Sequence, residues 1–383
     1  MVRINIVGDF SVQDLNGMSI GNALQKVLDT GDINLLNYEA PLVSSHSKPI
    51  KKSGPSLHQD HESPTFLKKH GFNAFTFANN HIMDYGVEAF LKTRNEFSDC
   101  IILGCGLWDE AYQCKIVTIQ NVKIGFLALT QYEFGVLEDE QYNSEEYGTA
   151  WLCHPCVDEL ILEAKQKCDY LVLLPHAGLE HFDFPLPELC TLYRHFVSMG
   201  ADAVIGNHPH VPQPWEKYKN TLIVYSLGNF VFDSLKAQNK WWNNGIMVQI
   251  LISEKKEISF EIKQICFDET SRKVDCCNEE AFEQHLKSIN EVFADKTKYL
   301  QIVNRHCLGL EFLYDYLFEC SGYIRPNIRK YVKEILLRFK EKFIRSSSDR
   351  YDYTSFINNL RCEPHRWVIS RIYELKSTKF YAK

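Results

Sequence analysis

The chain has 383 residues, of which 45% are hydrophobic and 13% aromatic, and a formal net charge of -7. This composition is typical of a globular protein with a large buried core and excludes a disordered chain. No apolar stretch approaches the roughly 18 to 20 residues that cross a bilayer, and a predicted strand begins almost at once, so we expect no secretory signal. The thirteen cysteines follow no regular framework, which favours mostly reduced thiols in a cytosolic protein.

Short apolar runs recur along the chain, and each ends at a polar cluster. The predicted strands are Arg3–Val7, Ile33–Leu36, Ala74–Phe77, Tyr170–Leu174 and Ala203–Ile205. Segments with helical spacing lie between them: Ile20–Leu28, Pro64–His70, Val87–Phe97, Val157–Lys167 and Pro187–Met199. Strands that alternate with helices predict an α/β fold, a layered sandwich with mainly parallel central strands.

Three further strands are expected outside this alternation. Lys123–Thr130 is apolar enough for a buried strand. Gly245–Ser253 and Glu257–Phe267 alternate more, and the charged residues between them suit a hairpin turn, which predicts an antiparallel edge. Two polar stretches, Val43–His61 and Glu133–Tyr147, are predicted to be long loops, the first of them over the site.

After about residue 270 the pattern becomes helical. Ala281–Phe293 and Glu311–Phe318 have helical spacing, and Ile328–Ile344 is a basic amphipathic helix. We therefore expect a domain over residues 1–270 and a helical, basic C-terminal extension over 271–383.

Charge is distributed unevenly along the chain. Residues 323–383 hold fifteen Lys and Arg against six Asp and Glu, a balance of +9, so the remainder carries -16. Such a tail can dock on an anionic membrane surface or an acidic polymer. A solvated helix face, or one paired with the acidic body of the chain, is the interpretation that we favour. No nucleic-acid motif is present.

Polar side chains with metal-ligand chemistry follow the predicted strands. The set is Asp9, Glu39, Asn80, His81, His176, His208 and His210. In α/β sheets ligands gather at the carboxyl ends of strands, so we expect these groups to share one site. Carboxylates, an amide and imidazoles together suit a borderline divalent ion such as Zn, Mn or Fe.

Two other sequence features stay open. Cys153 and Cys156 have redox or zinc spacing, but no second such pair exists, so ordinary thiols are favoured. Trp241 and Trp242 either line a substrate cleft or anchor a loop, with nothing in the sequence to favour one.

Six stretches resemble the CapA-like family of bacterial poly-γ-glutamate capsule synthesis proteins, within the calcineurin-like metallophosphoesterase superfamily. They lie within about residues 1–250 and follow the order of the family. They are GDF at 8–10, NYEAPL at 37–42, NNHIMDYG at 79–86, PHAGLEHFDFP at 175–185, GADAVIGNHPHVPQPWEKY at 200–218 and YSLGNFVFD at 225–233. The resemblance implies a metallophosphoesterase-like layered sandwich.

The resemblance also implies residue roles. Asp9, Glu39, Asn80, His176, His208 and His210 match the ligands of one or two divalent transition metal ions, with Glu39 in the bridging position. His81 matches the general acid that protonates the leaving group, a role that suits imidazole near neutral pH. Asp84, Glu180 and Asn229 lie in family motifs and are expected to support the site or face the substrate.

Two positions depart from the superfamily pattern. The first motif of phosphoesterases is Asp-x-His, whereas this chain has Ser11 at the third position. The bridging residue is Glu39 instead of aspartate. The first metal therefore lacks one imidazole, which leaves a two-metal site, a one-metal site and a binding site with little turnover as alternatives.

These features predict a capsule-related, metal-dependent hydrolase. Its expected substrate is a phosphoester, or an amide-linked surface polymer of the poly-γ-glutamate type or its precursor. The alternative is a non-catalytic polymer-binding component of capsule or polysaccharide assembly that uses the same cleft. The expected location is cytoplasmic, and peripheral contact at the inner membrane face through residues 323–383 is the alternative to a solvated or internally paired tail.

Overall fold

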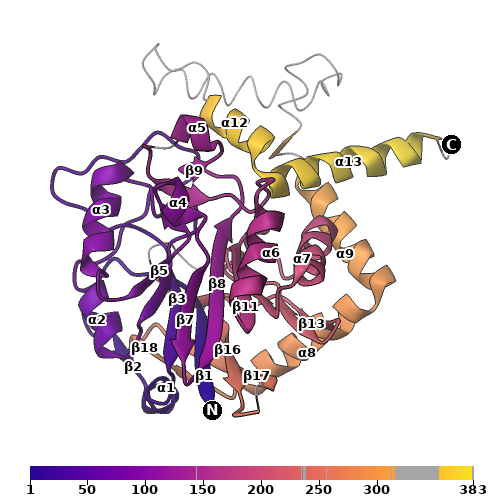
Figure 1. The fold of residues 1–383 in the computed structure, drawn as a ribbon. Helices are drawn as coiled ribbons and strands as arrows, with labels where there is room; N and C mark the ends of the chain where they lie inside the picture. The colour runs from indigo at the N-terminus through magenta and orange to yellow at the C-terminus, as the bar shows by residue number, and fades with distance from the viewer. Residues whose placement is uncertain are drawn as a thin grey trace. The chain divides into compact units, whose positions relative to one another are not determined.

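The structure is a computed structural model that describes residues 1–143, 145–233, 235, 239–255, 257–311, 313–314 and 353–381. The described residues form two compact units. One consists of 1–50 and 55–299, and the other of 51–54 and the described part of 300–383. The strands and the helices that pack on them belong to the first unit (Figure 1).

The first unit contains a nine-stranded sheet built around β1 (Val2–Ser11). On one side β1 pairs in parallel with β3, and β4 and β5 continue the parallel order. On the other side it pairs antiparallel with β16, which is followed by β17, β18 and β2, and β15 joins the carboxyl end of β1. The bounds are β3 Ile33–Tyr38, β4 Ala74–Thr76, β5 Ile101–Leu103, β16 Asn244–Ile252, β17 Ile258–Asp268, β18 Lys273–Cys276, β2 Ser19–Ile20 and β15 Asn229–Phe232.

The sequence of β1 explains its central position. All of its residues but Arg3 are buried, as expected of a strand covered on both faces. Gly8 allows β15 to lie against it, because a Cβ atom at this position would come within 1.8 Å of the Gly228 carbonyl oxygen. The register of β1 shifts between Asp9 and Phe10, next to the site.

A six-stranded sheet forms the second layer of strands, in the order β13, β14, β12, β11, β8, β7. Its inner strands β14, β12, β11 and β8 are parallel, and β13 and β7 are antiparallel at the two edges. The bounds are β13 Trp215–Tyr218, β14 Thr221–Val224, β12 Ala203–Ile205, β11 Tyr170–His176, β8 Val122–Thr130 and β7 Lys115–Ile119. A small three-stranded sheet joins β6 (Cys105–Gly106), β10 (Gly148–Ala150) and β9 (Val136–Leu137).

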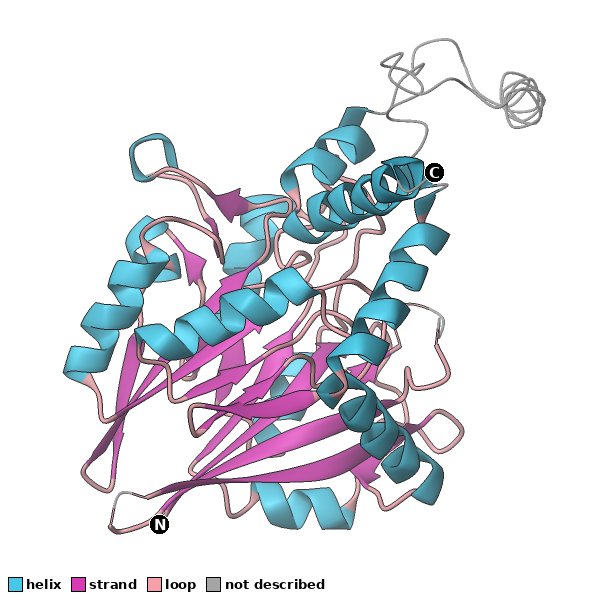
Figure 2. Ribbon diagram, turned by 90° about the vertical axis from the view of Figure 1, so that its right-hand side faces the viewer, coloured by secondary structure: helices cyan, strands magenta, loops and turns pink. Residues whose placement is uncertain are grey.

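Helices cover the strands on both sides (Figures 1 and 2). α1 (Asn22–Leu28), α2 (Ser63–Lys69) and α3 (Gly86–Glu96) bury apolar residues in the core of the first sheet. α6 (Val157–Lys167) and α7 (Pro187–Met199) pack on the second sheet. The remaining helices of this unit are α4 (Trp108–Ala111), α5 (Glu140–Asn143), α8 (Glu280–Ala294) and the start of α9 (Lys296–Gly309).

The predicted α/β class and the parallel central strands are confirmed, and all eight predicted strands form. The strands do not share one sheet, however, since β1, β3 and β4 lie in the first and β11 and β12 in the second. Apolar periodicity identifies a strand but does not identify its partners, which explains the difference. The predicted antiparallel pair is β16 and β17, but β16 is an inner strand because it also pairs with β1.

The second unit is helical in its described part, with most of α9, α12 (Tyr353–Arg361) and α13 (Glu363–Tyr381). Arg371 of α13 donates to Asn304 of α9 at 3.3 Å, and Tyr314 bonds to His365 at 2.7 Å. The predicted helix Ile328–Ile344 and most of Glu311–Phe318 lie outside the described residues. β18 and α8 follow residue 270 yet belong to the first unit, and the division into domains at 270 stays a prediction.

The cysteines of the described chain are mostly thiols, as predicted, and these include Cys153 and Cys156. The exception is a disulfide between Cys266 and Cys277, which joins β17 to the residue after β18. The sequence spacing of these two cysteines did not indicate it.

Candidate metal centre

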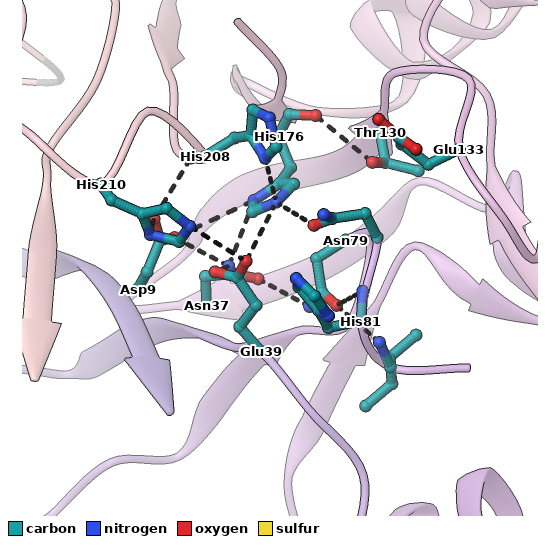
Figure 3. A network of polar contacts seen from close by, with 12 residues as sticks. Asp9, Asn37, Glu39, Asn79, His81, Thr130, Glu133, His176, His208 and His210 are labelled. Carbon is teal, nitrogen blue, oxygen red and sulfur yellow. Dashed lines mark hydrogen bonds and ion pairs between the residues drawn. The ribbon is translucent and has the colours of Figure 1, made fainter. Parts of the chain in front are cut away.

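The ends of five strands bring the predicted ligands together in one buried cluster. β1 contributes Asp9, β3 leads into Glu39, and β11 ends at His176. The segment after β4 contributes Asn80 and His81, and the segment after β12 contributes His208 and His210. Asp9 and Glu39 are fully buried, and the four histidines expose 4% or less of their surface. Figure 3 shows these side chains pointing toward one another.

Glu39 lies at the centre of this cluster. Its Oε1 atom is buried and has no hydrogen-bond partner among the described residues. It lies 3.6 Å from His176 Nε2 and 3.8 Å from His210 Nε2 (Figure 3). A buried carboxylate oxygen without a donor is costly in free energy unless a cation or proton satisfies it.

Two groups of ligand atoms share Glu39. The first consists of Glu39, His176 and His208, and its atoms lie within 4.8 Å of one another. His176 Nε2 lies 3.1 Å from His208 Nδ1 and 2.9 Å from Asn80 Oδ1, so the Asn80 oxygen points at the same place. We call this group position A.

The second group, position B, consists of Asp9, Glu39 and His210, again with ligand atoms within 4.8 Å. Asn229 Oδ1 lies 3.0 Å from His210 Nδ1, and accepting a hydrogen bond there would leave the lone pair on Nε2, the nitrogen nearer Glu39. The His208 backbone N–H donates to Asp9 Oδ2 at 3.2 Å. Both positions combine carboxylate oxygens and imidazole nitrogens, a donor set that fits Zn, Mn or Fe.

Ser11 occupies the third position of the motif that begins with Asp9. It is buried in β1, and its carbonyl oxygen accepts from the Asp233 backbone N–H at 3.0 Å. Among the described residues, position B has one imidazole, that of His210.

A chain of two amides, which the sequence did not single out, supports the carboxylates. Asn37 Nδ2 donates to Asp9 Oδ1 at 2.8 Å and to Glu39 Oε2 at 3.0 Å. Asn79 Nδ2 donates to Asn37 Oδ1 at 3.0 Å, and Asn79 Oδ1 accepts from the backbone N–H groups of His81 and Ile82. Because backbone N–H groups only donate, they fix the direction of both amides. The two amides thus hold the carboxylates of Asp9 and Glu39 in place.

His81 and Asp84 form a pair beside the two positions. His81 Nδ1 donates to Asp84 Oδ2 at 2.7 Å, and the Leu57 backbone N–H donates to the same oxygen at 2.7 Å. Both side chains are buried. Neither belongs to position A or B, which separates His81 from the ligand set.

Glu180 lies at the solvent side of the cluster, with 46% of its side chain exposed, and 3.6 Å separates its Oε2 from His181 Nε2. Desolvation would raise its pKa, but the nearby imidazoles of His208 and His210 lower the pKa to about 2. Trp242 is buried against His210 and donates to the Phe232 carbonyl, so it anchors its loop. Trp241 stacks on His285 of α8.

Burial shifts the ionisation of the central groups. Desolvation and the charge of Asp9 raise the pKa of Glu39 well above its usual range. Desolvation and the neighbouring imidazoles lower the pKa of His176, and desolvation lowers the pKa of His208 to about 4. Desolvation would also lower the pKa of His210, but the contact with Asp9 outweighs this effect and raises the pKa. A bound cation stabilises imidazoles in their neutral form and a carboxylate that lacks a hydrogen-bond donor.

The backbone around the histidines is strained. His208 has a φ of 102° and His210 a φ of 59°, a left-handed region that residues other than glycine rarely adopt. Such conformations cost of order 1–3 kcal/mol and cluster at functional sites. Here they turn two imidazoles from one loop toward Glu39.

Residues 4–234 match the family described as bacterial capsule synthesis protein PGA_cap. The chain belongs to this family. It is 29% identical to the PGA biosynthesis protein CapA of Bacillus subtilis (strain 168) over 263 residues, which are 66% of each protein. It is 30% identical to the capsule biosynthesis protein CapA of Bacillus anthracis over 203 residues, 51% of this chain and 49% of that protein.

The matches therefore span about two thirds of one relative and about half of the other. Among solved structures, the chain is similar to a hypothetical protein from Thermus thermophilus, at a TM-score of 0.45 and 15% identity over 69% of this chain and 99% of that one. It is also similar to 5'-nucleotidase from Candida albicans SC5314, at a TM-score of 0.40 and 11% identity over 70% of this chain and 53% of that one. Within the described residues, no helix is both long and apolar enough to cross a membrane.

Proposed function

We propose that this PGA_cap family member is a metal-dependent hydrolase of the metallophosphoesterase type with a capsule-related role. The observation that carries the proposal is Glu39 Oε1, a buried carboxylate oxygen that no donor of the described residues reaches, between the imidazoles of positions A and B. Its surroundings suit a group shared by two cations.

The residues that would hold the ions follow from the two positions. Glu39, His176, His208 and Asn80 serve position A, and Asp9, Glu39 and His210 serve position B. When bound, the ions supply Lewis acidity and lower the pKa of a water molecule.

The proton chemistry belongs to His81. Its contact with Asp84 places the proton of a neutral ring on Nδ1, so the pair holds the imidazole in one orientation. Once protonated on both nitrogens, the ring can donate to the oxygen or nitrogen of a leaving group, and Asp84 stabilises the cation. The proposed substrate is a phosphoester or an amide-linked, poly-γ-glutamate-like polymer or its precursor.

The test uses protein loaded with Mn²⁺ or Zn²⁺ and a generic aryl phosphate. We compare the wild type with His81→Asn and His208→Asn, and use His195→Asn as the matched control. His195 also contacts a carboxylate, Asp158 at 2.9 Å, but lies on the exposed face of α7.

The expected result is hydrolysis by the wild type and the His195 variant, with a loss of about 100-fold or more in the two site variants, the range expected for general acid catalysis. Equal rates in all four proteins would contradict the catalytic role. An aryl phosphate that no variant hydrolyses, combined with cleavage of a γ-linked glutamate oligomer by the wild type alone, would assign the amide substrate.

A second candidate is a non-catalytic component that binds an acidic polymer at the same site. Ser11 favours it, because position B lacks an imidazole of the phosphoesterase pattern. This version predicts binding of polyglutamate without turnover, weakened by salt if residues 323–383 contribute. If neither salt nor deletion of residues 323–383 changes the affinity, the tail does not contribute to binding. The cytoplasmic location and the membrane contact stay predictions.

A further inference from the structure

We propose that Glu180 selects the substrate by charge. It disfavours a dianionic reacting group at the metal centre and so favours a phosphodiester or a γ-linked amide over a phosphomonoester. The inference rests on the proposed function and names the substrate class of that site. Glu180 belongs to neither ligand position, and 46% of its side chain is exposed, whereas Asp9 and Glu39 are fully buried.

The segment around Glu180 lies against the loop that carries two predicted ligands. The His181 backbone N–H donates to the carbonyl of Pro209, the residue between His208 and His210, at 2.9 Å. The His181 ring stacks on the His210 ring, with centroids 6.1 Å apart and planes inclined by 28°. Since Glu180 Oε2 lies 3.6 Å from His181 Nε2, the carboxylate stands at the edge of the metal centre.

The backbone, and not the Glu180 side chain, holds this segment in place. His181 has a φ of 61°, in the left-handed region that residues other than glycine rarely adopt. Such conformations cluster at functional sites. Asn239 Nδ2 donates to the His181 carbonyl at 3.3 Å. A change of charge at residue 180 therefore leaves the contacts that position the segment intact.

The charge of Glu180 has no strong partner. Within the described part of the chain, its ion-pair contact is with His181, and no Lys or Arg lies within ion-pair distance. The charge is close enough to act on Glu39 and on His81, the proposed acid. A negatively charged group that reaches both the metal centre and His81 is therefore repelled by Glu180.

This repulsion grows with the charge of the substrate. A phosphomonoester is a dianion above about pH 6, whereas a phosphodiester carries one negative charge. The amide of a γ-linked glutamate chain is uncharged and has one carboxylate on the carbon next to its nitrogen. At about 5 Å from a partly exposed carboxylate, each substrate charge should weaken binding by about 10-fold. The phosphomonoester meets this penalty twice.

The test compares the wild type with Glu180→Gln, which keeps the shape of the side chain and removes its charge. Glu163→Gln is the matched control, because Glu163 of α6 is 52% exposed and pairs with Lys167. For Mn²⁺-loaded protein at about pH 8, where the monoester is a dianion, we measure kcat/KM for an aryl phosphomonoester and its methyl diester. Calorimetry with phenylphosphonate, a dianion, and its methyl ester, a monoanion, measures binding without turnover.

In Glu180→Gln, we expect kcat/KM for the monoester to rise about 10-fold more than that for the diester. Affinity for phenylphosphonate should likewise rise about 10-fold more than affinity for its methyl ester. Both differences should shrink at high salt, and Glu163→Gln should change neither.

Unchanged ratios would overturn the inference, as would an equal change for both members of each pair, which a merely structural role of Glu180 would produce. Turnover with unchanged ratios would leave the hydrolase standing without charge selection by Glu180. A changed binding ratio without turnover of either ester would count against phosphoester hydrolysis and leave the charge selection standing. Failure of both phosphonates to bind to any of the proteins would overturn the charge selection.

Discussion

His81 illustrates how much one side chain depends on its immediate partners. Its sequence neighbours do not distinguish a ligand from an acid, whereas its contact with Asp84 at 2.7 Å and its separation from positions A and B favour the proposed acid. The carboxylate orients the ring and stabilises its cationic form.

Replacement of Asp84 by Asn should lower kcat without removing metal. We expect a 10- to 100-fold loss, since general acid catalysis as a whole contributes about 10²- to 10⁴-fold. The alkaline limb of the pH–rate profile should also move to lower pH, because a general acid must be protonated and His81 would lose the carboxylate that favours its protonated form. A variant with full activity, or one that loses its metal, would refute the assigned role.

Stability of the metal-free protein should depend on pH through His208. Its folded pKa of about 4 lies below the unfolded value near 6.5, so the unfolded chain binds the proton more tightly. His208 therefore contributes stability above pH 6.5 that is lost as the pH falls toward 4. We expect His208→Asn to reduce the loss of unfolding free energy between pH 7 and pH 4 by about 1–3 kcal/mol.

Urea denaturation at several pH values, in the presence of chelator, measures this difference. Comparing the variant with the wild type removes the opposite contribution of Glu39, whose raised pKa makes it stabilising at low pH. Identical pH dependence in both proteins would show that His208 does not titrate between those limits.

Among single residues, the sequence predicted the candidate ligands that the structure brings together, but not the residues that support them. Asp9, Glu39, Asn80, His176, His208 and His210 lie in motifs that can be matched one residue at a time. Asn37 and Gln131 contact partners as far as 139 and 77 positions away, His176 and His208 respectively. A polar residue at the end of a buried run, as Asn37 is in β3, is the one signal that the sequence offers.

At the scale of the elements, buried amide side chains connect the paired strands β16, β1 and β3. Gln249 donates to Asn5 at 2.8 Å, and Asn5 donates to Asn34 at 2.7 Å. Asn5 faces Gln249 and Asn34 directly in the register of the three strands. A slip of one residue would bury unpaired amides, so these contacts favour a single register.

Replacement of Asn5 by Leu should destabilise the fold by about 2–4 kcal/mol, because two buried amides lose a partner at roughly 1–3 kcal/mol each. Ile6→Leu in the same strand is the control and should cost less than about 1.5 kcal/mol. Urea unfolding measures both. Equal effects would mean that the amide contacts add nothing beyond packing.

The strands themselves could be predicted because apolar runs end at polar clusters. Their division between two sheets could not, because apolar runs do not show which strands pair. The α1, α3, α6 and α7 helices follow from their spacing, whereas short strands such as β6 and β9 have only two residues and no periodicity.

At the scale of the whole molecule, bound metal ions should stabilise the fold in addition to their proposed part in the reaction. Positions A and B join segments from β1 to the residues after β12, and an ion bound only to the folded chain stabilises it by linkage. At a free concentration of about 100 times Kd this amounts to about 2.7 kcal/mol.

Saturation with Mn²⁺ or Zn²⁺ should therefore raise Tm by several degrees, and chelation should reverse the shift. Scanning calorimetry measures it, with Glu39→Gln as the variant that should not respond. A Tm that is insensitive to both ions would argue against a site that spans the fold.

The most direct test is elemental analysis of protein purified without added metal, for the wild type, Glu39→Gln and Glu180→Gln. The two variants make the same change of charge, one at the shared buried carboxylate and one at the solvent side. We expect one or two equivalents of Mn, Zn or Fe in the wild type and in Glu180→Gln, and a large loss in Glu39→Gln. A metal-free wild type that also fails to bind added ions, or equal metal in all three proteins, would contradict the account.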